Sequence, residues 1–555
     1  MDWNLADLFE LVADTVPDRI ALAHGVDGPT RTWRAFDRNA NALALHLARN
    51  HRPSDKLALY AYNRPEFVEA LSGAMKARMV PVNVNYRYRE EELVYLLDNS
   101  DSTAVVYESE FADRVAKVRD RLPKVKEWIE ITDGEDASAG LAGARSERNA
   151  SGVHELGNAF AIRWDEIVGA GTDERLVLRR DPADLLFMYT GGTTGMPKGV
   201  MWEHRALYNS LGGGGNAVLG EKASESVEEH RERVANEARG QRLLPACPLM
   251  HGTGLFTAIN ALGGGGAIVT IKAKSLDAEE LWSTIEARRA NACAIVGDAF
   301  AKPMLKALQE NRGRWDLSKF VLLVSSGVMW SPQVKQALLD ELPHALLYDS
   351  FGSSEAVGFG AELTTKASTI SLGKFRIGPN CKVFTPDGKE VEPGCGEKGY
   401  IARSGPIPLG YYKDEKKSAE TFKTYQGRRW SIPGDWCTVN ADGTIVLHGR
   451  GSVCINTAGE KVYPEEVEET LKTHPAVADA LVVGVPDEKW GESVTGVVRL
   501  EPGANATEEE LRGHVRERLA GYKTPKRIVF TEASMRAPNG KADYKSAKRI
   551  AIAGA

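Results

Sequence analysis

The feature that most constrains the fold is an alternation of short apolar runs with amphipathic stretches, which continues from residue 1 to about residue 450. The run DLLFMY at 184–189 has the length and composition of a buried strand, whereas LWSTIEARRA at 281–290 carries apolar residues at helical spacing. Strands that alternate with helices form sheets covered by helices, so we expect a layered α/β architecture. No segment recurs at a fixed period, which excludes repeat architectures.

The 555 residues are enough for three to four units of roughly 150 residues each. After Gly449-Arg450 the sequence pattern becomes that of a compact α+β unit. This change predicts a large domain at 1–449 and a small α+β domain at 450–555. Within the small domain we expect a helix at 464–473 that begins with Pro464, and strands in ADALVVGV, SVTGVVRL and RIVF. Thr507 and Glu510 have the spacing of a capping box at the start of a further helix.

Composition excludes several classes of protein. Lys+Arg 70 against Asp+Glu 76 gives a net charge of -6, which disfavours a nucleic-acid-binding surface as the main function. No apolar run is long enough to cross a bilayer and the first residues are acidic, so we expect a cytoplasmic protein. The six cysteines form no C-x-x-C pair and have no histidines at zinc spacing, which predicts reduced, mostly buried thiols.

The most informative motif is TGGTTGMPKG at 190–199, directly after the predicted strand at 184–189. Glycines let backbone N–H groups approach phosphate oxygens, Thr193 and Thr194 add hydroxyl donors, and Lys198 adds a positive charge. The motif is not a Walker A loop, because its Lys does not follow Gly directly and is not followed by Ser or Thr. The residues therefore predict a site for a nucleotide triphosphate.

This loop resembles the phosphate-binding motif of the adenylate-forming superfamily, which includes acyl-CoA synthetases, luciferases and adenylation domains of peptide synthetases. Gly191 replaces the usual serine. The resemblance implies a large domain with two sheets, helices and a small β-barrel-like subdomain, followed by a mobile small domain. It also implies that the loop binds ATP through Thr190, Gly191, Gly192, Thr193, Thr194, Gly195 and Lys198.

A second motif, DSFGSSE at 349–355, resembles the superfamily's Y-G-x-T-E. The resemblance implies that Asp349, Phe351 and Ser354 belong to the nucleotide site, with the Phe351 ring on the adenine and the Ser354 hydroxyl on a phosphate. It also implies that Glu355, together with Thr193, holds Mg²⁺. Carboxylate oxygens are ligands that Mg²⁺ prefers beside phosphates.

Two further positions match the superfamily's ribose contacts. Asp435 in SIPGDW is the expected partner of both ribose hydroxyls, and Arg450 in GR is the second anchor. The resemblance implies a hinge near 449–453, where Gly451 permits large backbone rotation. Ser452 stands where the superfamily commonly has Asp or Lys, so this hinge departs from the pattern.

The resemblance also assigns residues to the small domain. Gly459, Glu460 and Lys461 match the segment that lines the CoA tunnel, and Lys541 in PNGK matches the lysine that enters the site during adenylation. The expected catalytic residues are therefore Lys541, Lys198, Glu355 and Thr193. Because Lys541 would obstruct the thiol, the small domain is expected to rotate between the two half-reactions.

Further residues are expected to form the acyl pocket. His251 in PLMHGTG resembles an element at the junction of the nucleotide and acyl sites, and a histidine satisfied within the core is the alternative. Asp298, Ser326, Gly327 and Val328 are also expected in the pocket wall. The glycine runs at 212–215 and 263–266 are expected to loosen loops or make room near a pocket. The charged segment at 221–241 is expected to be an exposed helix or a mobile insertion, without a chemical role.

The resemblance implies an enzyme that uses ATP, Mg²⁺ and coenzyme A to activate a carboxylic acid as an acyl-adenylate and transfer it to CoA. Segments such as GYYKDEKKSAETF and GEKVYPEEVEE are most similar to bacterial acyl-CoA synthetases for fatty or steroid side-chain acids. An aryl acid–CoA ligase, an amide-forming ligase and a non-catalytic nucleotide-binding regulator remain open. A membrane-associated acid carrier would need a membrane-binding patch that the sequence does not display. A homodimer is also open.

Overall fold

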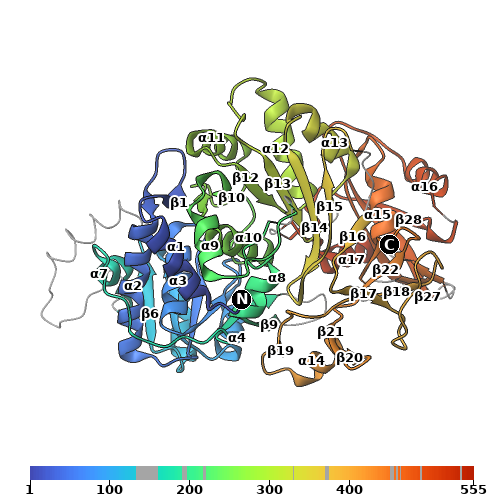
Figure 1. Cartoon of the computed structure of the whole chain (residues 1–555). Helices are drawn as coiled ribbons and strands as arrows, with labels where there is room; N and C mark the ends of the chain where they lie inside the picture. Colours follow the sequence, from blue (N-terminus) through green and yellow to red (C-terminus); the bar gives the residue numbers. More distant parts are fainter. Residues whose placement is uncertain are drawn as a thin grey trace, which may run out of the picture.

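The computed structural model describes residues 1–132, 160–190, 197–216, 220–328, 330–368, 374–450, 455–457, 460–462, 464–487, 491–519, 521–537 and 540–554. Two large sheets and a smaller one carry helices on their faces, and the C-terminal part lies at one side of the molecule (Figure 1). The layered α/β fold and the small α+β unit predicted from the sequence are confirmed.

The first sheet has the strand order β19-β9-β8-β4-β3-β5-β6-β7. Its strands are β3 (Lys56–Tyr60), β4 (Val80–Asn83), β5 (Ser102–Glu108), β6 (Glu127–Ile131), β7 (Ile162–Arg163), β8 (Leu185–Thr190), β9 (Lys198–Glu203) and β19 (Gly410–Tyr411). Helices α2 (Trp33–Asn50) and α3 (Pro65–Lys76) pack on the face that includes Leu57, whereas α4 (Glu90–Asn99) and α5 (Ala112–Val118) pack on the face that includes Ala58. Successive residues of a strand point to opposite faces, so both faces are buried.

The second sheet begins with the order β2-β1-β11-β10-β12-β13-β14. Its strands are β1 (Ile20–His24), β2 (Thr30–Thr32), β10 (Arg242–Pro245), β11 (Ala267–Thr270), β12 (Ala292–Ile295), β13 (Leu322–Ser326) and β14 (Leu346–Ser353). All neighbours from β1 to β14 are parallel. The associated helices are α1 (Leu5–Thr15), α8 (His204–Ser210), α9 (Val227–Ala235), α10 (Gly252–Gly263), α11 (Ala278–Arg288), α12 (Asp298–Glu310) and α13 (Pro332–Glu341). Parallel strands place their carboxyl ends at one edge, where ligands bind in open α/β sheets.

Antiparallel strands continue the second sheet beyond β14 and form a subdomain with its own apolar core around Phe359 and Ile401. They are β15 (Ala356–Thr364), β16 (Lys374–Ile377), β17 (Cys381–Phe384), β18 (Lys398–Arg403), β20 (Phe422–Tyr425), β21 (Arg428–Ser431), β22 (Asp435–Val439) and β23 (Thr444–Arg450). Two short helices, α7 (Trp164–Val168) and α14 (Glu415–Thr421), complete the large part of the chain.

The small C-terminal unit has its own sheet of β24 (Ile455–Thr457), β25 (Glu460–Val462), β26 (Val477–Asp487), β27 (Gly491–Leu500) and β28 (Arg527–Phe530). Helices α15 (Pro464–Lys472), α16 (Glu508–Arg516) and α17 (Tyr544–Ala553) belong to it. Thr507 Oγ accepts the Glu510 N–H and the Glu510 carboxylate accepts the Thr507 N–H, so the predicted capping box is present. β23 therefore ends in the large sheet at Arg450 and the small sheet begins at Ile455.

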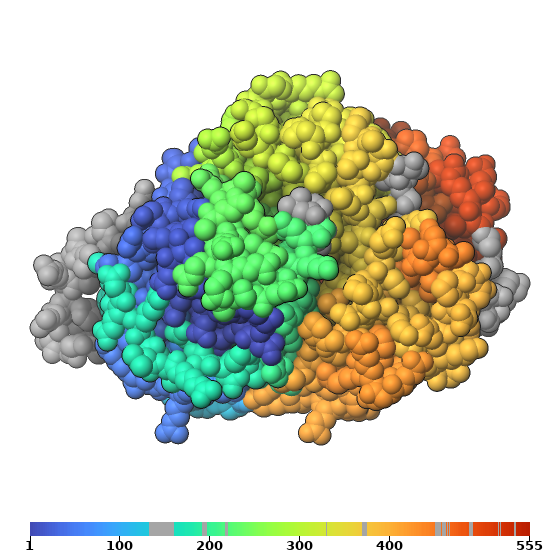
Figure 2. All heavy atoms as spheres, viewed as in Figure 1, coloured from blue at the N-terminus to red at the C-terminus, as the bar shows by residue number. Residues whose placement is uncertain are grey.

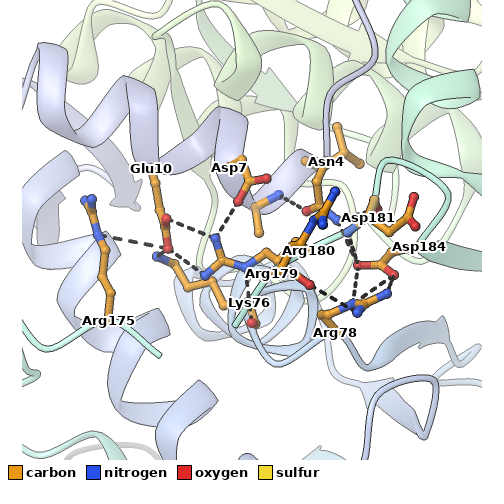
Figure 3. Close-up of polar contacts among 12 residues, drawn as sticks. Asn4, Asp7, Glu10, Lys76, Arg78, Arg175, Arg179, Arg180, Asp181 and Asp184 are labelled. Carbon is orange, nitrogen blue, oxygen red and sulfur yellow. Dashed lines mark hydrogen bonds and ion pairs between the residues drawn. The ribbon is translucent and has the colours of Figure 1, made fainter. Parts of the chain in front are cut away.

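A buried charge cluster ties the start of the chain to the segment before β8 (Figure 3). Lys76 at the end of α3 donates hydrogen bonds to Glu10, Asp37 and Asn41, at 2.6–2.7 Å. Arg180 pairs with Asp7 and Glu10 of α1. Because each cation of the cluster contacts carboxylates, the charges offset one another, and removal of one partner would leave an uncompensated buried charge.

In the space-filling view, the C-terminal part covers one side of the strands that follow β14 (Figure 2). Among the described helices, none is long and apolar enough to cross a bilayer. Of the described cysteines, Cys247, Cys293, Cys381 and Cys437 are buried thiols and Cys395 is exposed.

Candidate active site

The motif at 190–199 joins two adjacent strands. β8 and β9 are antiparallel with Thr190 opposite Lys198, so the two residues that flank the glycines lie side by side. Gly191, Gly192, Thr193, Thr194 and Gly195 lie outside the described residues. The strand predicted at 184–189 is confirmed as β8, which carries Thr190 at its carboxyl end.

Lys198 forms an ion pair with Asp414, the N-cap of α14. The contact is partly exposed, and hydrogen bonds from Lys198 and the Lys417 backbone lower the pKa of Asp414. Sequence reasoning missed Asp414, because 216 positions separate it from Lys198 and no local motif connects them. A triphosphate that reaches Lys198 would compete with this carboxylate.

Ser354 and Glu355 form the turn of the hairpin between β14 and β15, in which Ser353 pairs with Ala356. Glu355 is only 7% exposed, and its carboxylate accepts a 2.8 Å hydrogen bond from Tyr411 Oη. Its backbone carbonyl accepts a 2.7 Å bond from Ser431 Oγ. The turn is therefore fixed from several strands, as expected for groups that must be held in place for catalysis.

Asp349 and Phe351 of β14 contact other side chains of the large domain. Asp349 forms a 2.8 Å ion pair with Lys335, and burial raises its pKa to about 6 although the lysine opposes the shift. The Phe351 ring packs 5.2 Å from Phe359 and 5.3 Å from Phe375, measured between centroids. Neither residue lines the cavity described below.

Asp435 begins β22, is 7% exposed and pairs in register with Arg450 of β23. The two residues expected at the ribose are thus neighbours on adjacent strands although 15 positions separate them in the chain. The backbone register explains how the GD and GR motifs reach one place.

A cavity of about 590 Å³ lies between one face of the second sheet and helices α8 and α10. Alternate residues of two strands line it: Leu322, Val324 and Ser326 from β13, and Leu346, Tyr348 and Ser350 from β14. From α10 come Gly252, Thr253, Phe256, Thr257, Ile259, Asn260 and Gly263, which share one helix face. The lining also includes Asn291 and Ala292 at one end of β12 and Val296 just beyond its other end, which are about 16 Å apart at about 3.3 Å per residue. The cavity therefore follows the full length of the strands.

One end of the cavity gathers the polar candidates. His251, Ser354, Ser326, Gly327 and Lys541 all line it. Gly327 has a φ of +95°, and a Cβ on it would lie 3.9 Å from Lys541 Cε, so the lysine reaches the carboxyl end of β13. The structure thus brings a residue of the small domain to the loops of the large one.

Two polar atoms at this end have no hydrogen-bond partner among the described residues. They are His251 Nε2 and Ser353 Oγ, both buried. Burial, and then the charges of Lys541 and Arg87, lower the pKa of His251 to about 3, which keeps the ring neutral near pH 7. A neutral imidazole and a hydroxyl that are buried without partners are suited to a polar ligand.

Some expected pocket residues lie elsewhere. Asp298 accepts a 3.0 Å hydrogen bond from the Ser331 N–H and does not line the cavity. It lies near Glu469 and Lys472 of the small domain and acts on their pKa values. Val328 packs against the large core instead. Asp298 begins α12 and Val328 follows the end of β13, so neither belongs to the strand faces that line the cavity.

The CoA and hinge candidates are only partly described. Glu460 and Lys461 lie in β25, opposite Thr457 and Asn456 of β24. Gly459, Gly451 and Ser452 lie outside the described residues.

The charged segment at 221–241 contributes to the cavity, a role that the expectation of an exposed helix or mobile insertion did not include. Val234 of α9 is buried, and Arg233 and Arg239 line the far end. Gly212, Gly214, Gly215, Gly263 and Gly264 line the cavity as well, which confirms that the two glycine runs make room. The dense charge concealed this role, because too few apolar residues mark the packed face.

Comparison with known proteins fits this geometry. Residues 9–412 match the family of AMP-binding enzymes and residues 466–541 match the AMP-binding enzyme C-terminal domain. The chain belongs to this family of AMP-binding enzymes.

Individual relatives span nearly the whole chain. The chain is 41% identical over 554 residues to the 3-oxocholest-4-en-26-oate–CoA ligase of Rhodococcus rhodochrous, covering 99% of this chain and 96% of that protein. It is 43% identical over 548 residues to a medium/long-chain-fatty-acid–CoA/3-oxocholest-4-en-26-oate–CoA ligase of Mycobacterium marinum, covering 98% and 96%. The fold matches the anthranilate CoA ligase AuaEII in complex with anthranoyl-AMP at a TM-score of 0.80 and 21% identity, covering 99% and 98%.

Proposed function

We propose that this protein is an AMP-forming acyl-CoA synthetase for medium- or long-chain fatty acids or steroid side-chain acids. The observation that carries the proposal is the cavity of about 590 Å³, which runs along the sheet from Lys541 and His251. Its volume is typical of a small-molecule site and its walls are largely apolar. The cavity lining reaches from Asn291, just before β12, to Val296, just after it, and five residues of extended chain span about 16 Å. This span exceeds a single aromatic ring and supports an extended acid over an aryl acid.

The chemistry joins two anions into a mixed carboxylic–phosphoric anhydride, the acyl-adenylate, and then exchanges this anhydride for a thioester. A carboxylate oxygen of the acid attacks the α-phosphorus of ATP. The bond from this phosphorus to the oxygen that bridges to the β-phosphorus breaks, which gives the acyl-adenylate and free pyrophosphate. The thiol of CoA then loses its proton, attacks the acyl carbon and displaces AMP. Lys541 at the mouth of the cavity would offset the charge of the carboxylate and the α-phosphate during the first step.

Lys198 and the loop after Thr190 would hold the outer phosphates, and Asp435 with Arg450 the ribose. Ser354 and the Phe351 strand would border the nucleotide. Mg²⁺ bound to nucleotide phosphates needs one or two protein carboxylates. Glu355 fits this requirement, and no cluster of three potential ligands is present among the described residues. When bound, the ion would withdraw charge from the departing pyrophosphate.

The small domain is proposed to pivot near 449–453, so that Gly459, Glu460 and Lys461 replace Lys541 for thioester formation. Lys541→Ala should then depress acyl-adenylate formation by about 10²- to 10³-fold. Thioester formation from supplied acyl-adenylate should change far less. Equal losses in both assays would contradict the alternation of domains.

Pyrophosphate release with aliphatic, aryl and steroid acids, each with and without CoA, tests the activity itself. We expect release with long aliphatic or steroid acids, and an acyl-CoA product only when CoA is present. Transfer to an amine instead of CoA would identify an amide-forming ligase. No release with any acid, despite ATP binding, would favour a nucleotide-binding regulator.

A further inference from the structure

Lys541 lies in a short hairpin, in which residues 535–537 pair with residues 541–543. Arg536 and Ala542 form an antiparallel bridge, and the Ala537 N–H donates a 2.7 Å hydrogen bond to the Lys541 carbonyl. The Asp543 N–H donates a 2.9 Å bond to the carbonyl of Met535, which is 1% exposed in the apolar core of the small domain. The position of the Lys541 backbone therefore depends on what holds Arg536.

Arg536 forms a two-pronged ion pair with Asp479 of β26. Its Nε and Nη2 atoms donate hydrogen bonds of 2.8 and 2.6 Å to the two carboxylate oxygens. Both side chains are largely buried, at 20% and 11% exposure. A planar guanidinium bound at two points fixes orientation as well as position, which a lysine would not do.

The same strand contacts the large domain beside this ion pair. Lys302 of α12 donates a 2.7 Å hydrogen bond to the carbonyl of Ala478, the residue before Asp479. At the tip, Gly540 has a φ of +80°, and a Cβ there would lie 3.1 Å from the Phe300 ring and 3.3 Å from Ala299. Helix α12 thus contacts both the strand that holds Arg536 and the tip that carries Lys541.

Other charged groups surround Arg536 without replacing Asp479. Glu468, Glu469 and Lys472 come from α15, and Tyr544 begins α17. Glu468 is bound by the Val482 N–H and Tyr544 Oη, and Glu469 pairs with Lys472. Each of these groups has a partner of its own, and within the described ranges Asp479 is the residue to which the guanidinium donates two hydrogen bonds.

We infer that Arg536 is a positioning residue for adenylation, which holds the Lys541 hairpin through Asp479 while α12 holds β26. The inference rests on the proposed function for its catalytic consequence. It assigns the two domains a coupled arrangement, in which docking of β26 on α12 and entry of Lys541 into the cavity occur together. Arg536 touches no substrate, and its effect is transmitted through the hairpin.

The test compares Arg536→Met, Asp479→Asn and Arg536→Lys with the control Arg516→Met, whose side chain is 53% exposed on α16. Acyl-adenylate formation from acid and ATP should fall on the order of 10- to 100-fold in Arg536→Met and Asp479→Asn, because small displacements of a catalytic group have this effect. Thioester formation from supplied acyl-adenylate should change less than about 3-fold, and Arg536→Lys should recover part of the loss. The control should match the wild-type protein in both assays.

Hydrogen–deuterium exchange across 535–543 gives a second readout that needs no catalysis. Exchange there should rise in Arg536→Met and Asp479→Asn and remain unchanged in the control, with β27 as an internal reference. Unchanged exchange, or equal losses in both half-reactions, would overturn the inference. Absence of acyl-adenylate from the wild-type protein would instead overturn the proposed function, and the exchange result would still decide the inference. If Arg536→Met does not fold, Asp479→Asn and Arg536→Lys carry the same comparisons.

Discussion

Asp414 forms an ion pair with Lys198, the lysine of the motif at 190–199, although 216 positions separate them in the chain. The Asp414 carboxylate already pairs with the Lys198 ammonium group, which a triphosphate would need as its own partner. Asp414→Asn should therefore lower the Kd for ATP about 2- to 5-fold, a modest effect because the pair is partly exposed. Asparagine also serves as an N-cap, so α14 should remain intact.

Isothermal titration of ATP into both proteins measures this change. Lys198→Met is the matched control and should weaken ATP binding, since it removes the cation instead of its competitor. Weaker binding in Asp414→Asn would mean that the carboxylate organises the phosphate site instead of competing for it.

Val324 lies midway along β13 on the wall of the cavity. Val324→Trp should obstruct the cavity beyond this point, while its end at Lys541 stays open. We expect kcat/KM for a long-chain or steroid acid to fall at least about 10-fold relative to a four-carbon acid, as is typical of altered apolar pockets. A comparison of both acids within the same variant provides the control. An equal loss for both acids would place the acyl chain elsewhere.

Gly540 and Gly503 form a matched pair of glycines in the small domain. Their φ values are +80° and +78°. A Cβ on Gly540 would contact α12, whereas a Cβ on Gly503 would meet nothing within 4 Å. Alanine at either position costs roughly 1–2 kcal/mol of backbone strain. Only Gly540→Ala should also displace Lys541, so acyl-adenylate formation should fall well below that of Gly503→Ala. Thermal unfolding should shift similarly in both variants, and equal activity would show that contact with α12 is unimportant.

His204 at the start of α8 is buried, and burial lowers its pKa from 6.5 to about 4, against the opposing effect of Asp184. The folded state therefore keeps the ring neutral, while the unfolded chain takes up a proton near pH 6.5. The contribution of His204 to stability is complete above about pH 6.5 and is lost as the pH falls toward about 4. His204→Gln should show a smaller drop in Tm between pH 7.5 and pH 5 than the wild-type protein. A parallel drop in both would show that other groups control acid stability.

Several parts of the molecule followed from sequence alone. The helix at Pro464, the capping box of Thr507 and Glu510, and strand β8 were predicted because each depends on interactions within a few residues. The family was predicted from the resemblance of the ordered motifs to those of the adenylate-forming superfamily, and residues 9–412 and 466–541 match its models. Local hydrogen bonds and periodicity depend on residues close together in the chain, so the sequence shows them directly.

The tertiary structure decided which of these residues meet. Asp298 faces the small domain and Asp349 pairs with Lys335, because the pleat of a strand and the turn that begins a helix determine which side a residue faces. The charged segment around α9 became a wall of the cavity only once it packed beside α1. The Lys198–Asp414 and Arg536–Asp479 pairs depend on strands brought together over long distances in the chain. Such partners arise from the packing of whole elements, which no spacing within one motif encodes.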